Sequence, residues 1–511
     1  PQIYELWVSE REQLLNHSEN VINHLKKEQT LNEENIELSQ EIISKTKSIL
    51  SRIYDQESAG FGSEPKFPMP HYLIFLLEQF NKSSEEEWLQ MVEESLAAMR
   101  AGGIFDQLGG GFHRYTTDRN WELPHFEKML YDQALLIYIY AEAYRKTKKN
   151  IYLDTVKKTV SYLKREMQNQ EGAFYSAEDA DSEGAEGKFY FWDKNEISEL
   201  LSEKEYQEFF RVFKDKDLKE ITLSLSRAAD FAELKEIKGR LFEERKKRIR
   251  PDKDKKILTD WNGLTAAALA KAGFVAGDQE YIELAEKTVN YIFNNLRNKD
   301  GSLVHSFHQG SFSEVDNLND YAFLLWALIE LQQATLKNEY LYKAEEIAEL
   351  MTARFWDQKA GGFYFTAAEN NDLFLRQKKT EDSAIPSANS IACYNLLRLS
   401  HLLDDYDLRK KVEEMLSTFS AAAASAPASH LFMVLSYQYL KNPFKEINIY
   451  GSPDDQKVKK LLDYLRDNYK PELLLKIHPA AETESKAEFS LCRNFTCGEK
   501  TDNLDDIISK I

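Results

Sequence analysis

Cysteine, long apolar runs and positive charge are all scarce in this 511-residue chain. With only three cysteines, Cys393, Cys492 and Cys497, the chain cannot be held together by a framework of disulfides. No apolar run approaches the 18 or so residues that a membrane-spanning helix requires, and the N-terminus lacks the basic start and apolar stretch of a secretory signal. We therefore expect a protein of the reducing cytoplasm that does not enter a membrane.

The charge balance narrows the range of partners. Lysine and arginine number 66 against 85 aspartates and glutamates, which leaves a formal net charge of −19. Nucleic acids and anionic membranes attract basic surfaces, so neither is an expected partner. The chain contains no Walker-type nucleotide loop and no His-Glu-x-x-His zinc motif, so we expect no cofactor and no metal ion. It begins at Pro1 instead of methionine, which indicates a fragment or a processed product.

Helical periodicity is abundant. Val156, Val160, Leu163 and Met167 recur at the spacing that places an apolar stripe on one helix face. The same spacing predicts helices over 72–80, 133–145, 264–274, 281–296, 322–329, 341–355 and 390–403.

A second signal repeats between these helices, namely a glycine followed by alternating aromatic or apolar residues. Glycine permits a tight turn, and the alternation is typical of a short β-ladder. The glycines that mark the repeat are Gly60, Gly111, Gly172, Gly301 and Gly362. The intervals are about 51, 61, 129 and 61 residues, so one of them is about two periods long. It contains the polar stretch 194–256, which we interpret as an unmarked hairpin plus an insertion.

This repeat predicts about six helical hairpins. A hairpin cannot bury its apolar face alone, so neighbours must stack, either as an open α-solenoid or as a closed double ring. The long, uneven, aromatic loops favour the ring. We therefore predict a mainly α fold, an (α/α)6 toroid over 31–440, whose glycine-marked loops meet around one acidic, aromatic pocket. Residues 1–30 are interpreted as the remnant of a linker or the end of an upstream domain.

The last 70 residues or so change character. The strands predicted there cover 446–450, 473–477 and 487–492, and the helices cover 455–468 and 504–511. This pattern predicts a small α/β lobe over 441–511. Cys492 and Cys497 lie in this lobe, at a spacing typical neither of redox motifs nor of zinc knuckles. For them we favour structural burial or a fortuitous pair.

Several long motifs resemble one protein family. In chain order they are FGSEPKFP (Phe61–Pro68), GGGFHRYTTDRNWELPHFEKMLYDQA (Gly109–Ala134), YSAEDADSEG (Tyr175–Gly184), EGKFYFW (Glu186–Trp192), ILTDWNGL (Ile257–Leu264), NDYAFLLWALIEL (Asn319–Leu331) and CRNFTC (Cys492–Cys497). They resemble, in the same order, signatures of the YyaL-like family, which includes spermatogenesis-associated protein 20 and is described as thioredoxin-domain-containing. The resemblance covers essentially the whole chain.

The resemblance implies a six-hairpin glycosidase-like toroid similar to that of N-acylglucosamine 2-epimerases. It also implies an N-terminal thioredoxin-like domain, which we expect to be missing before Pro1. Such a domain is thus the expected protein partner in the full-length family, and a small molecule such as a sugar is the expected ligand of the pocket. The sequence departs from the family at Ala388, where glycine is common, and a bulkier residue can narrow that loop.

The loop from Gly109 to Asp132 holds the densest group of chemically active side chains. His113 and His125 lie on either side of a turn, and two facing imidazoles can remove a proton from one side of a sugar carbon and return it to the other. The epimerases that share the fold are thought to use a histidine pair in this way. The alternative is that both histidines bond to the backbone and lock the loop. The neighbours expected to bind substrate are Arg114, Trp121, Glu127 and Asp132.

A second acidic cluster runs from Glu178 to Gly184. Asp179 is a candidate acid or base, and Glu178 and Asp181 are candidate substrate ligands. The cluster begins like a calcium-binding loop, but Tyr190 stands where the bidentate glutamate belongs, so calcium is not expected. Tyr190 and Trp192 offer the ring stacking that holds sugars. The alternative is a hydrated loop rich in turn-forming residues.

Polar residues recur at the same end of later hairpins. Asp260 is a candidate catalytic residue, and its alternative role is an N-cap. The residues there expected to bind substrate are Trp261, Asn262, Asp320, Tyr321, Asp382 and Asn389. Each is weak evidence alone, but together they place a polar residue at one end of most hairpins, which mere solvent exposure does not require.

The sequence leaves more than one class of function open. The first is a carbohydrate-active enzyme, an epimerase, isomerase or glycoside hydrolase, with His113 and His125 as acid and base and the Asp179 and Asp260 loops positioning the sugar. The second is a non-catalytic module whose pocket binds a ligand, or a peptide presented to a thioredoxin-like partner. The third is a purely structural scaffold.

Overall fold

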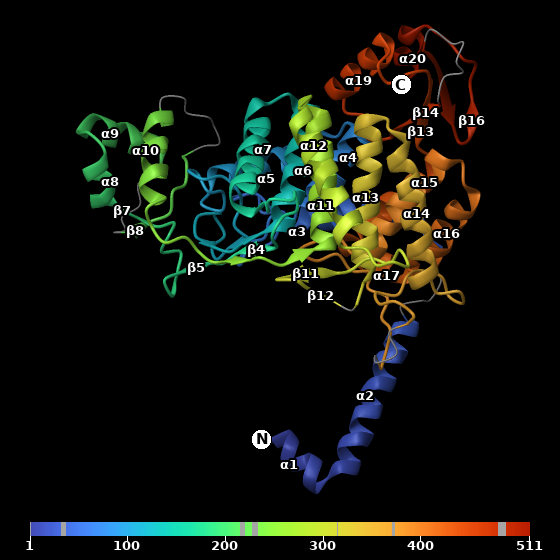
Figure 1. Ribbon diagram of the computed structural model, residues 1–511, viewed down its shortest axis with the longest axis horizontal. Helices are drawn as coiled ribbons and strands as arrows, with labels where there is room; N and C mark the ends of the chain where they lie inside the picture. The colour runs from blue at the N-terminus through green and yellow to red at the C-terminus, as the bar shows by residue number, and fades with distance from the viewer. Residues whose placement is uncertain are drawn as a thin grey trace.

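The computed structural model describes residues 2–31, 37–214, 220–226, 234–313, 315–369, 374–478 and 487–511. Helices dominate it, and they stand side by side between two ends of different character (Figure 1). Short strands and loops gather at the lower end of the view, and a small α/β lobe covers the upper end. The predicted mainly α class with a C-terminal α/β lobe is therefore confirmed.

Six helices form an inner ring in the described part of the chain. They are α4 (Pro70–Ser83), α6 (Leu130–Thr147), α11 (Thr259–Ala276), α13 (Leu318–Thr335), α15 (Ala388–Leu403) and α18 (Leu431–Lys441). Each packs against the next, and α18 packs back against α4. Gln79 of α4 and Gln438 of α18 exchange amide hydrogen bonds across this junction, at 2.9 and 3.2 Å. The ring is closed, as predicted, so the helices do not form an open solenoid.

An outer helix backs each inner helix. These outer helices are α5 (Glu86–Ala101), α7 (Asn150–Tyr162, continued by a π-helical turn Leu163–Met167), α12 (Gln279–Asn295), α14 (Asn338–Phe355), α16 (Tyr406–Thr418) and α3 (Glu41–Ile53). The outer helices expose one face and bury the other, whereas the inner helices are buried nearly all round. Helices α17 (Ser420–Ser425) and a 3₁₀ turn (Pro427–Ser429) lead into α18.

The sixth pair is not where the repeat placed it. Helix α3, near the start of the chain, packs against α18, near the end of the ring, and together they close the circle. The prediction of an unmarked ring hairpin within 194–256 is therefore wrong. That stretch instead forms α8 (Lys194–Leu200), α9 (Glu203–Val212) and α10 (Lys235–Arg245) beside the ring, with strands β7 (Trp192–Asp193) and β8 (Glu220–Ile221). Residues 215–219 and 227–233 of it lie outside the described residues.

The insertion has its own apolar core, which explains why it leaves the ring. Ile197, Phe209, Leu225 and Leu241 are fully buried within it, and Trp192 packs in the same cluster. A helix pair that buries its apolar face locally has no need of a neighbour in the ring.

The glycine-marked turns behave as predicted. Gly60, Gly111, Gly172, Gly301 and Gly362 all have positive φ, between 73° and 99°. Each precedes a residue in an antiparallel bridge with the segment just after an outer helix, as in Phe105 with Phe112 and Trp356 with Phe363. The turns thus carry the chain from an outer helix to the next inner helix, all at the same end of the ring.

The α/β lobe covers the opposite end of the ring. Its sheet has the order β14–β13–β15–β16, with β13 (Lys445–Tyr450) parallel to β14 (Leu473–His478) and antiparallel to β15 (Glu488–Arg493). The strand β16 (Thr496–Cys497) and the helices α19 (Gln456–Asp467) and α20 (Leu504–Lys510) complete it. Residues 479–486 lie outside the described residues.

Beneath the lobe, the ring axis holds a small polar cavity of about 60 Å³. Glu330 of α13 lines it and is paired with Lys271 of α11 at 3.0 Å and with Arg398 of α15 at 2.9 Å. These cations lower the pKa of the buried Glu330 to about 2. A three-helix ion cluster therefore ties the inner helices together at the end away from the loops.

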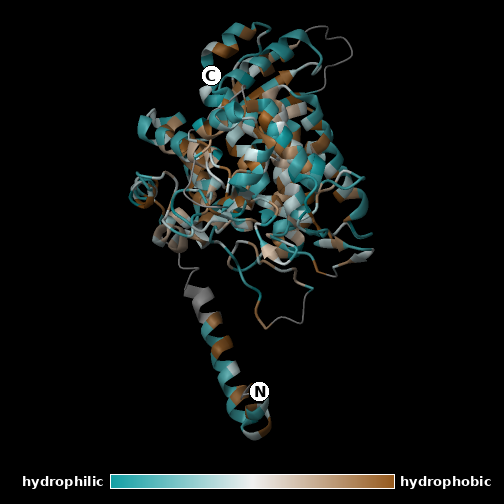
Figure 2. Cartoon of the chain, turned by 90° about the vertical axis from the view of Figure 1, so that its left-hand side faces the viewer, coloured by the Kyte–Doolittle hydropathy of each residue, from teal (hydrophilic) through white to brown (hydrophobic). Residues whose placement is uncertain are grey.

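A helical arm, α1 (Gln2–Ser9) and α2 (Arg11–Leu31), stands clear of the ring (Figure 2). Apolar side chains on it are exposed, including Ile3 at 73% and Val8 at 69%. No helix in the described part of the chain is both long and apolar enough to cross a bilayer.

Candidate functional site

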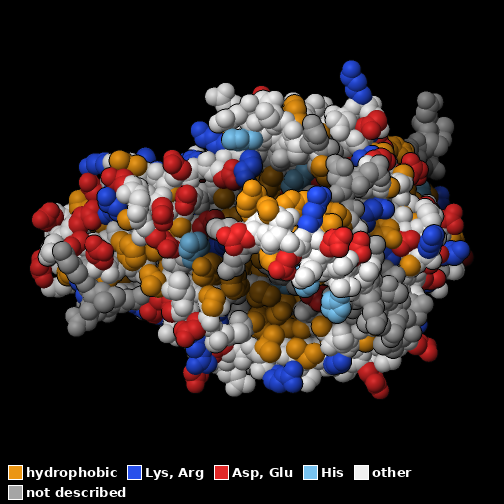
Figure 3. Space-filling view, turned by 90° about the horizontal axis from the view of Figure 1, so that it is seen from below, with side chains coloured by type: hydrophobic (Ala, Val, Ile, Leu, Met, Phe, Trp, Pro, Cys, Tyr) orange, Lys and Arg blue, Asp and Glu red, His pale blue; other side chains and the backbone are white. Residues whose placement is uncertain are grey.

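The loop end of the ring is hollowed, and hydrophobic side chains line the hollow, with acidic and histidine side chains near them (Figure 3). Short ladders build this end. A three-stranded ladder contains β10 (Ile257–Leu258), β11 (Ser306–His308) and β12 (Ser311–Phe312). A second contains β3 (Lys128–Met129), β4 (Ala177–Glu178) and β9 (Lys253–Asp254), and the pairs β1 (Tyr115–Thr116) with β2 (Pro124–His125) and β5 (Asp181–Ser182) with β6 (Ala185–Glu186) lie alongside.

The ladder of β10 and β11 brings Asp260 and His305 together. Leu258 pairs with Ser306, and the Thr259 amide donates to the carbonyl of His305 at 2.9 Å. Asp260 follows immediately at the start of α11, whereas His305 precedes β11. Asp260 and His305, far apart in sequence, meet because α11 begins directly after β10, next to the residue where the partner strand β11 begins.

Asp320, at the start of the neighbouring helix α13, completes the cluster. His305 Nδ1 lies 2.9 Å from Asp320 Oδ1, and one donor atom from each of Asp260, His305 and Asp320 lies within 4.8 Å of the others. Asn319 Nδ2 lies 3.4 Å from Asp260 Oδ2 and links the first turns of the two helices. Both carboxyl groups are buried, whereas the His305 side chain is 30% exposed.

Burial and mutual charge set the protonation of this cluster. Burial, with the Asp320 charge adding to it, raises the pKa of Asp260 to about 7. Burial lowers the pKa of His305, but the hydrogen bond and charge of Asp320 outweigh it and raise the pKa to about 9. Burial also raises the pKa of Asp320, against the pull of His305. Near neutral pH the cluster therefore holds an imidazolium beside an aspartate that can either give or take a proton.

The same three side chains are spaced closely enough for a cation to bridge them. However, every carboxylate oxygen already has a donor from the protein. Asp320 accepts from His305 and from the Asn317 amide, and Asp260 accepts from the Trp261 amide and from Asn319. We therefore describe the cluster as a hydrogen-bonded ion pair and assign no metal to it.

A chain of polar and aromatic contacts continues from Asp260 along the first turns of α11 and α6. The rings of Trp261 and Tyr131 meet edge to face at 4.9 Å, and Arg114 Nε donates to the Tyr131 hydroxyl at 3.2 Å. Arg114 also donates to Glu127 at 3.1 Å. The His125 ring follows, with Nε2 at 3.8 Å from Glu127 and Nδ1 at 2.6 Å from Glu186.

This arc joins residues that the sequence predicted from separate loops. Arg114, Glu127 and His125 come from the first predicted cluster, and Trp261 and Asp260 come from a later hairpin. Asp132 lies in the first turn of α6, buried, and its Oδ2 has no hydrogen-bond partner among the described residues. Burial raises the pKa of Asp132 well above its usual range, which favours the protonated form of this carboxyl close to the arc.

His113 is separated from His125 by its environment. It is buried, its Nδ1 lies 2.9 Å from the Phe126 carbonyl, and its ring packs edge to face against Tyr190 at 4.7 Å and Phe126 at 5.2 Å. Burial holds its pKa well below the usual range. His125, in contrast, is partly exposed and bonded to Glu186. The hydrogen bond of His113 to the backbone is the arrangement that the alternative interpretation of this pair predicted.

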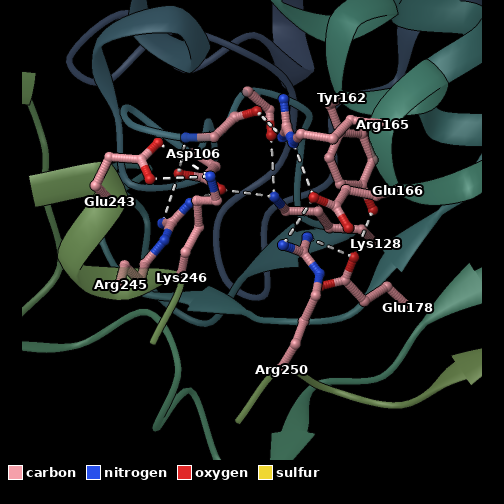
Figure 4. A network of polar contacts seen from close by, with 12 residues as sticks. Asp106, Lys128, Tyr162, Arg165, Glu166, Glu178, Glu243, Arg245, Lys246 and Arg250 are labelled. Carbon is pink, nitrogen blue, oxygen red and sulfur yellow. Dashed lines mark hydrogen bonds and ion pairs between the residues drawn. The ribbon is translucent and has the colours of Figure 1, made fainter. Parts of the chain in front are cut away.

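Glu178 lies in a buried ionic network between the insertion and the ring loops (Figure 4), and Tyr190 is bonded to it. Glu178 accepts from Tyr162 at 3.1 Å, Tyr190 at 2.9 Å and Arg250 at 2.9 Å. Beside it, Asp106 accepts from both terminal nitrogens of Arg245 at 2.8 Å and from Lys128 at 2.9 Å. Burial lowers the pKa of Lys128 to about 8 against the opposing charge of Asp106. The network anchors α10 to the ring.

Two other predicted ligands, Asn262 and Asn389, hold the framework, and so does Gln133, which the sequence did not single out. They bond both backbone groups of a residue one or two positions after a marker glycine, namely Phe174, Phe363 and Phe112 respectively, at 2.7–3.0 Å. The Tyr321 hydroxyl accepts from the Leu303 amide at 2.9 Å in the equivalent place. We call these four contacts the turn staples. Each joins a glycine turn to the inner helix that follows it.

The remaining predicted residues are spread around the loop end. Trp121 is buried and donates to backbone carbonyls of the first glycine turn, and Trp192 is buried in the insertion core. Asp382 accepts from the amides of Ser387 and Leu431 and so joins the starts of α15 and α18, and burial raises its pKa to about 7. Asp179 and Asp181 are exposed near the β5–β6 hairpin.

His305, Tyr131 and Glu186 are the residues of the arc that the sequence did not single out. His305 closes the glycine-marked segment that begins at Gly301, and Tyr131 is the neighbour of a predicted residue. The available signal was the recurrence of polar residues in the first turn of inner helices. It covered Asn319 and Tyr131, but it could not pair His305 with Asp320.

Parts of this chain are similar to known proteins. Residues 248–379 match the N-acylglucosamine 2-epimerase family. The crystal structure of D-mannose isomerase superposes with a TM-score of 0.49 and 12% identity, covering 75% of this chain and 85% of that one. A family 76 glycoside hydrolase (mannosidase) from Bacteroides thetaiotaomicron superposes with a TM-score of 0.49 and 11% identity, covering 79% and 100%.

Curated relatives match over far more of the chain. Spermatogenesis-associated protein 20 of Rattus norvegicus is 32% identical over 478 residues, which cover 83% of this chain and 61% of the relative. The Homo sapiens protein of the same name is 31% identical over the same shares. The chain therefore spans about three fifths of the length of the curated relatives it matches. The resemblance predicted from the motifs is confirmed, because over most of its length this chain is similar to spermatogenesis-associated protein 20.

Proposed function

We propose that the loop end of the ring is an acid–base active site for a sugar or a closely similar polyol, and that the reaction is an epimerisation or isomerisation. The observation that carries this proposal is the meeting of Asp260 and His305 at the mouth of the ring. A carboxyl group with a pKa of about 7 beside an imidazolium is a matched base and acid at neutral pH.

The roles follow from the contacts. Asp260 takes a proton from carbon, His305 gives or shares a proton with the neighbouring oxygen, and Asp320 holds the His305 ring and its charge through the 2.9 Å hydrogen bond. Trp261 and Tyr131 offer faces and edges for stacking a sugar ring, and Arg114 with Glu127 offers donors and acceptors for its hydroxyls.

Glycoside hydrolysis fits the cluster less well. Inverting hydrolases separate their two carboxyl groups by roughly 6.5–9.5 Å to admit a water molecule, and retaining hydrolases by roughly 5–5.5 Å. One carboxylate oxygen of Asp260 and one of Asp320 lie within 4.8 Å of each other, and Asp320 already accepts hydrogen bonds from His305 and from the helix start. Proton transfer at one carbon needs no second free carboxylate, so it uses the observed arrangement directly.

A ligand-binding module is the second candidate. The observation that favours it is the environment of His113, which is buried and bonded to a backbone carbonyl. On this proposal the loop end of the ring binds a sugar, or a peptide that is presented to a thioredoxin-like partner, without catalysing a reaction.

Turnover by the purified protein distinguishes the two candidates. A panel of reducing mono- and disaccharides is incubated in D2O, and proton NMR follows both product formation and deuterium entry at the carbon beside the carbonyl. The enzyme proposal predicts deuterium entry for at least one sugar, and a loss of at least about 100-fold in Asp260→Asn and in His305→Gln. His308→Gln, an exposed histidine three positions further along β11, is the matched control and keeps full activity.

Exchange that persists in both site variants would contradict the roles of Asp260 and His305. No exchange with any sugar, combined with thermal stabilisation of the intact protein by one of them, would favour the binding module instead.

A further inference from the structure

The C-terminal lobe contains a disulfide that the proposed sugar site does not use. Cys492 and Cys497 are joined across the hairpin of β15 and β16, where they face each other in register. The third cysteine, Cys393, is a free, buried thiol in α15. The predicted scarcity of disulfides holds for the chain as a whole, but these two cysteines form a covalent pair.

The two sulfur-bearing residues differ sharply in access. Cys492 is completely buried, whereas Cys497 is exposed at the edge of the sheet. An incoming thiolate must approach one sulfur of a disulfide directly and expel the other. The burial pattern therefore makes Cys497 the sulfur that is attacked and Cys492 the sulfur that leaves.

A buried side-chain amide contacts the sulfur of Cys492, the leaving group. Asn448, in the central strand β13, points its Nδ2 at Cys492 Sγ at 2.8 Å and lies 3.8 Å from Cys497 Sγ. Its Oδ1 accepts a hydrogen bond from His478 Nε2 on β14, which fixes the direction of the amide. A disulfide sulfur is a weak acceptor, so a buried amide donor gains little from it. A Cys492 thiolate would be a strong acceptor at the same place.

We propose that the Cys492–Cys497 pair is a thiol–disulfide exchange site that reacts with a protein dithiol through Cys497. Asn448 is a positioning residue that stabilises Cys492 as the leaving thiolate. This activity is independent of the proposed sugar chemistry, because the lobe lies at the end of the ring away from the loops.

The exchange balances in two steps. A thiolate of the partner attacks Cys497 Sγ, the bond between the two sulfurs breaks, and its electron pair goes to Cys492, whose thiolate accepts the Asn448 hydrogen bond. The second partner thiol loses its proton to solvent and attacks the partner's own sulfur in the mixed disulfide, which expels Cys497 as a thiolate. The partner dithiol is oxidised to a disulfide, and the Cys492–Cys497 disulfide is reduced to two thiols that take up protons from solvent.

The site of attack is tested on the intact wild-type protein. Reduced glutathione is added without denaturant, the reaction is quenched with acid, and peptide mass spectrometry locates the mixed disulfide. The proposal predicts glutathione on Cys497. Glutathione on Cys492, or a disulfide that dithiothreitol reduces only after the protein is unfolded, would overturn it.

The role of Asn448 is tested through the pKa of the Cys492 thiol in a Cys497→Ser background, measured from the pH dependence of the Cys492 13Cβ chemical shift, because this readout needs no reagent to reach the buried sulfur. Adding Asn448→Leu removes a hydrogen bond to the thiolate, so we expect the pKa of the Cys492 thiol to rise by about one unit. This corresponds to an acid dissociation constant about tenfold smaller. Asn468→Leu, at the end of α19 in the same lobe, is the matched control and leaves the pKa unchanged. Circular dichroism verifies folding of each variant, and an unchanged pKa in folded Asn448→Leu would remove Asn448 from the mechanism.

Discussion

Amide side chains in the first turn of the inner helices carry much of the geometry of the loop end. Asn262 donates to one backbone group of Phe174 and accepts from the other, so it imitates a strand neighbour for a turn that has none. A buried backbone group without a partner costs free energy, and the side chain removes that cost while fixing the turn against the helix. The turn staples therefore position His305 and Asp260 indirectly, by holding the turns beside the ladder of β10 and β11, next to which both residues lie.

Removing one staple should destabilise the protein measurably. In Asn262→Ala both backbone groups of Phe174 lose their partners in a buried site, and we expect the free energy of unfolding to fall by about 2–4 kcal/mol. Urea denaturation measures the difference. Asn319→Ala, one helix further round the ring, is the matched control, because Asn319 is half-buried and staples no turn, and its cost should stay below about 1 kcal/mol. Equal costs for the two variants would contradict the staple role.

The ion pair of His305 and Asp320 has a signature that needs no substrate. The pKa of His305 is about 9 because Asp320 stabilises the imidazolium. In Asp320→Asn this charge is lost while burial remains, so the pKa should fall to about 6.5 or lower. NMR titration of the His305 ring measures it, with His308 as the internal control that does not move. A pKa that stays near 9 in the variant would show that another group supplies the stabilisation.

These two pKa shifts also predict stability that falls with rising pH, each in its own pH window. His305 has a folded pKa above its unfolded value, so the stability it contributes is complete below about pH 6.5 and is lost as the pH rises toward 9. Asp260 is raised as well, to about 7, so the folded state binds the proton more tightly than the unfolded state does. Its contribution is complete below about pH 4 and is lost between about pH 4 and 7.

At the scale of elements, the insertion is attached to the ring by buried ions. Its last helix, α10, ends in Arg245, which forms a two-pronged contact with Asp106 in the loop after α5. Arg250, which follows α10 in the chain, forms an ion pair with Glu178 in β4. The insertion has its own apolar core, so these contacts determine its orientation more than its folding.

Removing the Arg245 side chain should therefore loosen the attachment of the insertion to the ring and leave the buried charge of Asp106 with less compensation. In Arg245→Met the buried Asp106 loses one of the two cations that it contacts and keeps Lys128 and the amides of Leu108 and Gly109, and we expect a loss of about 3–5 kcal/mol in unfolding free energy. Hydrogen exchange should rise in α8 to α10 before it rises in the ring. The matched control is Arg240→Met, on the same helix, whose exposed pair with Glu205 is worth no more than about 1 kcal/mol. Uniform acceleration across all helices would contradict the anchoring role.

At the scale of the whole molecule, closure of the ring couples the two ends of the chain. Tyr439 of α18 donates to Glu78 of α4 at 2.6 Å, next to the amide pair of Gln79 and Gln438. A closed ring loses stability as a unit, because each inner helix has two neighbours, whereas a linear stack can open from its ends.

Tyr439→Phe tests this coupling. The variant loses one buried hydrogen bond, which should lower the free energy of unfolding by about 1 kcal/mol. Hydrogen exchange by mass spectrometry should then accelerate in α4 as well as in α18. Acceleration confined to α18 would be the behaviour of an open stack. Tyr437→Phe, whose hydroxyl bonds the Leu38 carbonyl outside the inner ring, serves as the control for losing one hydroxyl in the same helix.

Much of this architecture was predictable because its signals are local. The stripes of apolar residues determine the helices, and glycines such as Gly111 and Gly362 mark turns that require positive φ. Both signals act over a few residues. The recurrence of Asp260 and Asp320 at helix starts likewise indicated which end of the ring carries the chemistry, since the period of the repeat places them at equivalent positions.

The rest depended on contacts between distant segments. The burial of His113 is produced by Tyr190 and Phe126, and no feature of the sequence near His113 distinguishes it from the partly exposed His125. His305 becomes an imidazolium candidate only because α13 brings Asp320 to it. The pairing of α3 with α18 was missed because the repeat counts hairpins that are continuous in sequence, and this pair is made from both ends of the ring.

The sequence by itself determined the helical elements, the glycine turns, the α/β lobe and the family resemblance, because periodicity, turn chemistry and motifs depend on neighbouring residues. Only the tertiary structure decided which titratable groups share a dielectric environment: Asp260 with His305, Asp106 with Arg245, and Asn448 with Cys492. Protonation and reactivity depend on distance and burial, and those arise when separate helices and strands pack together.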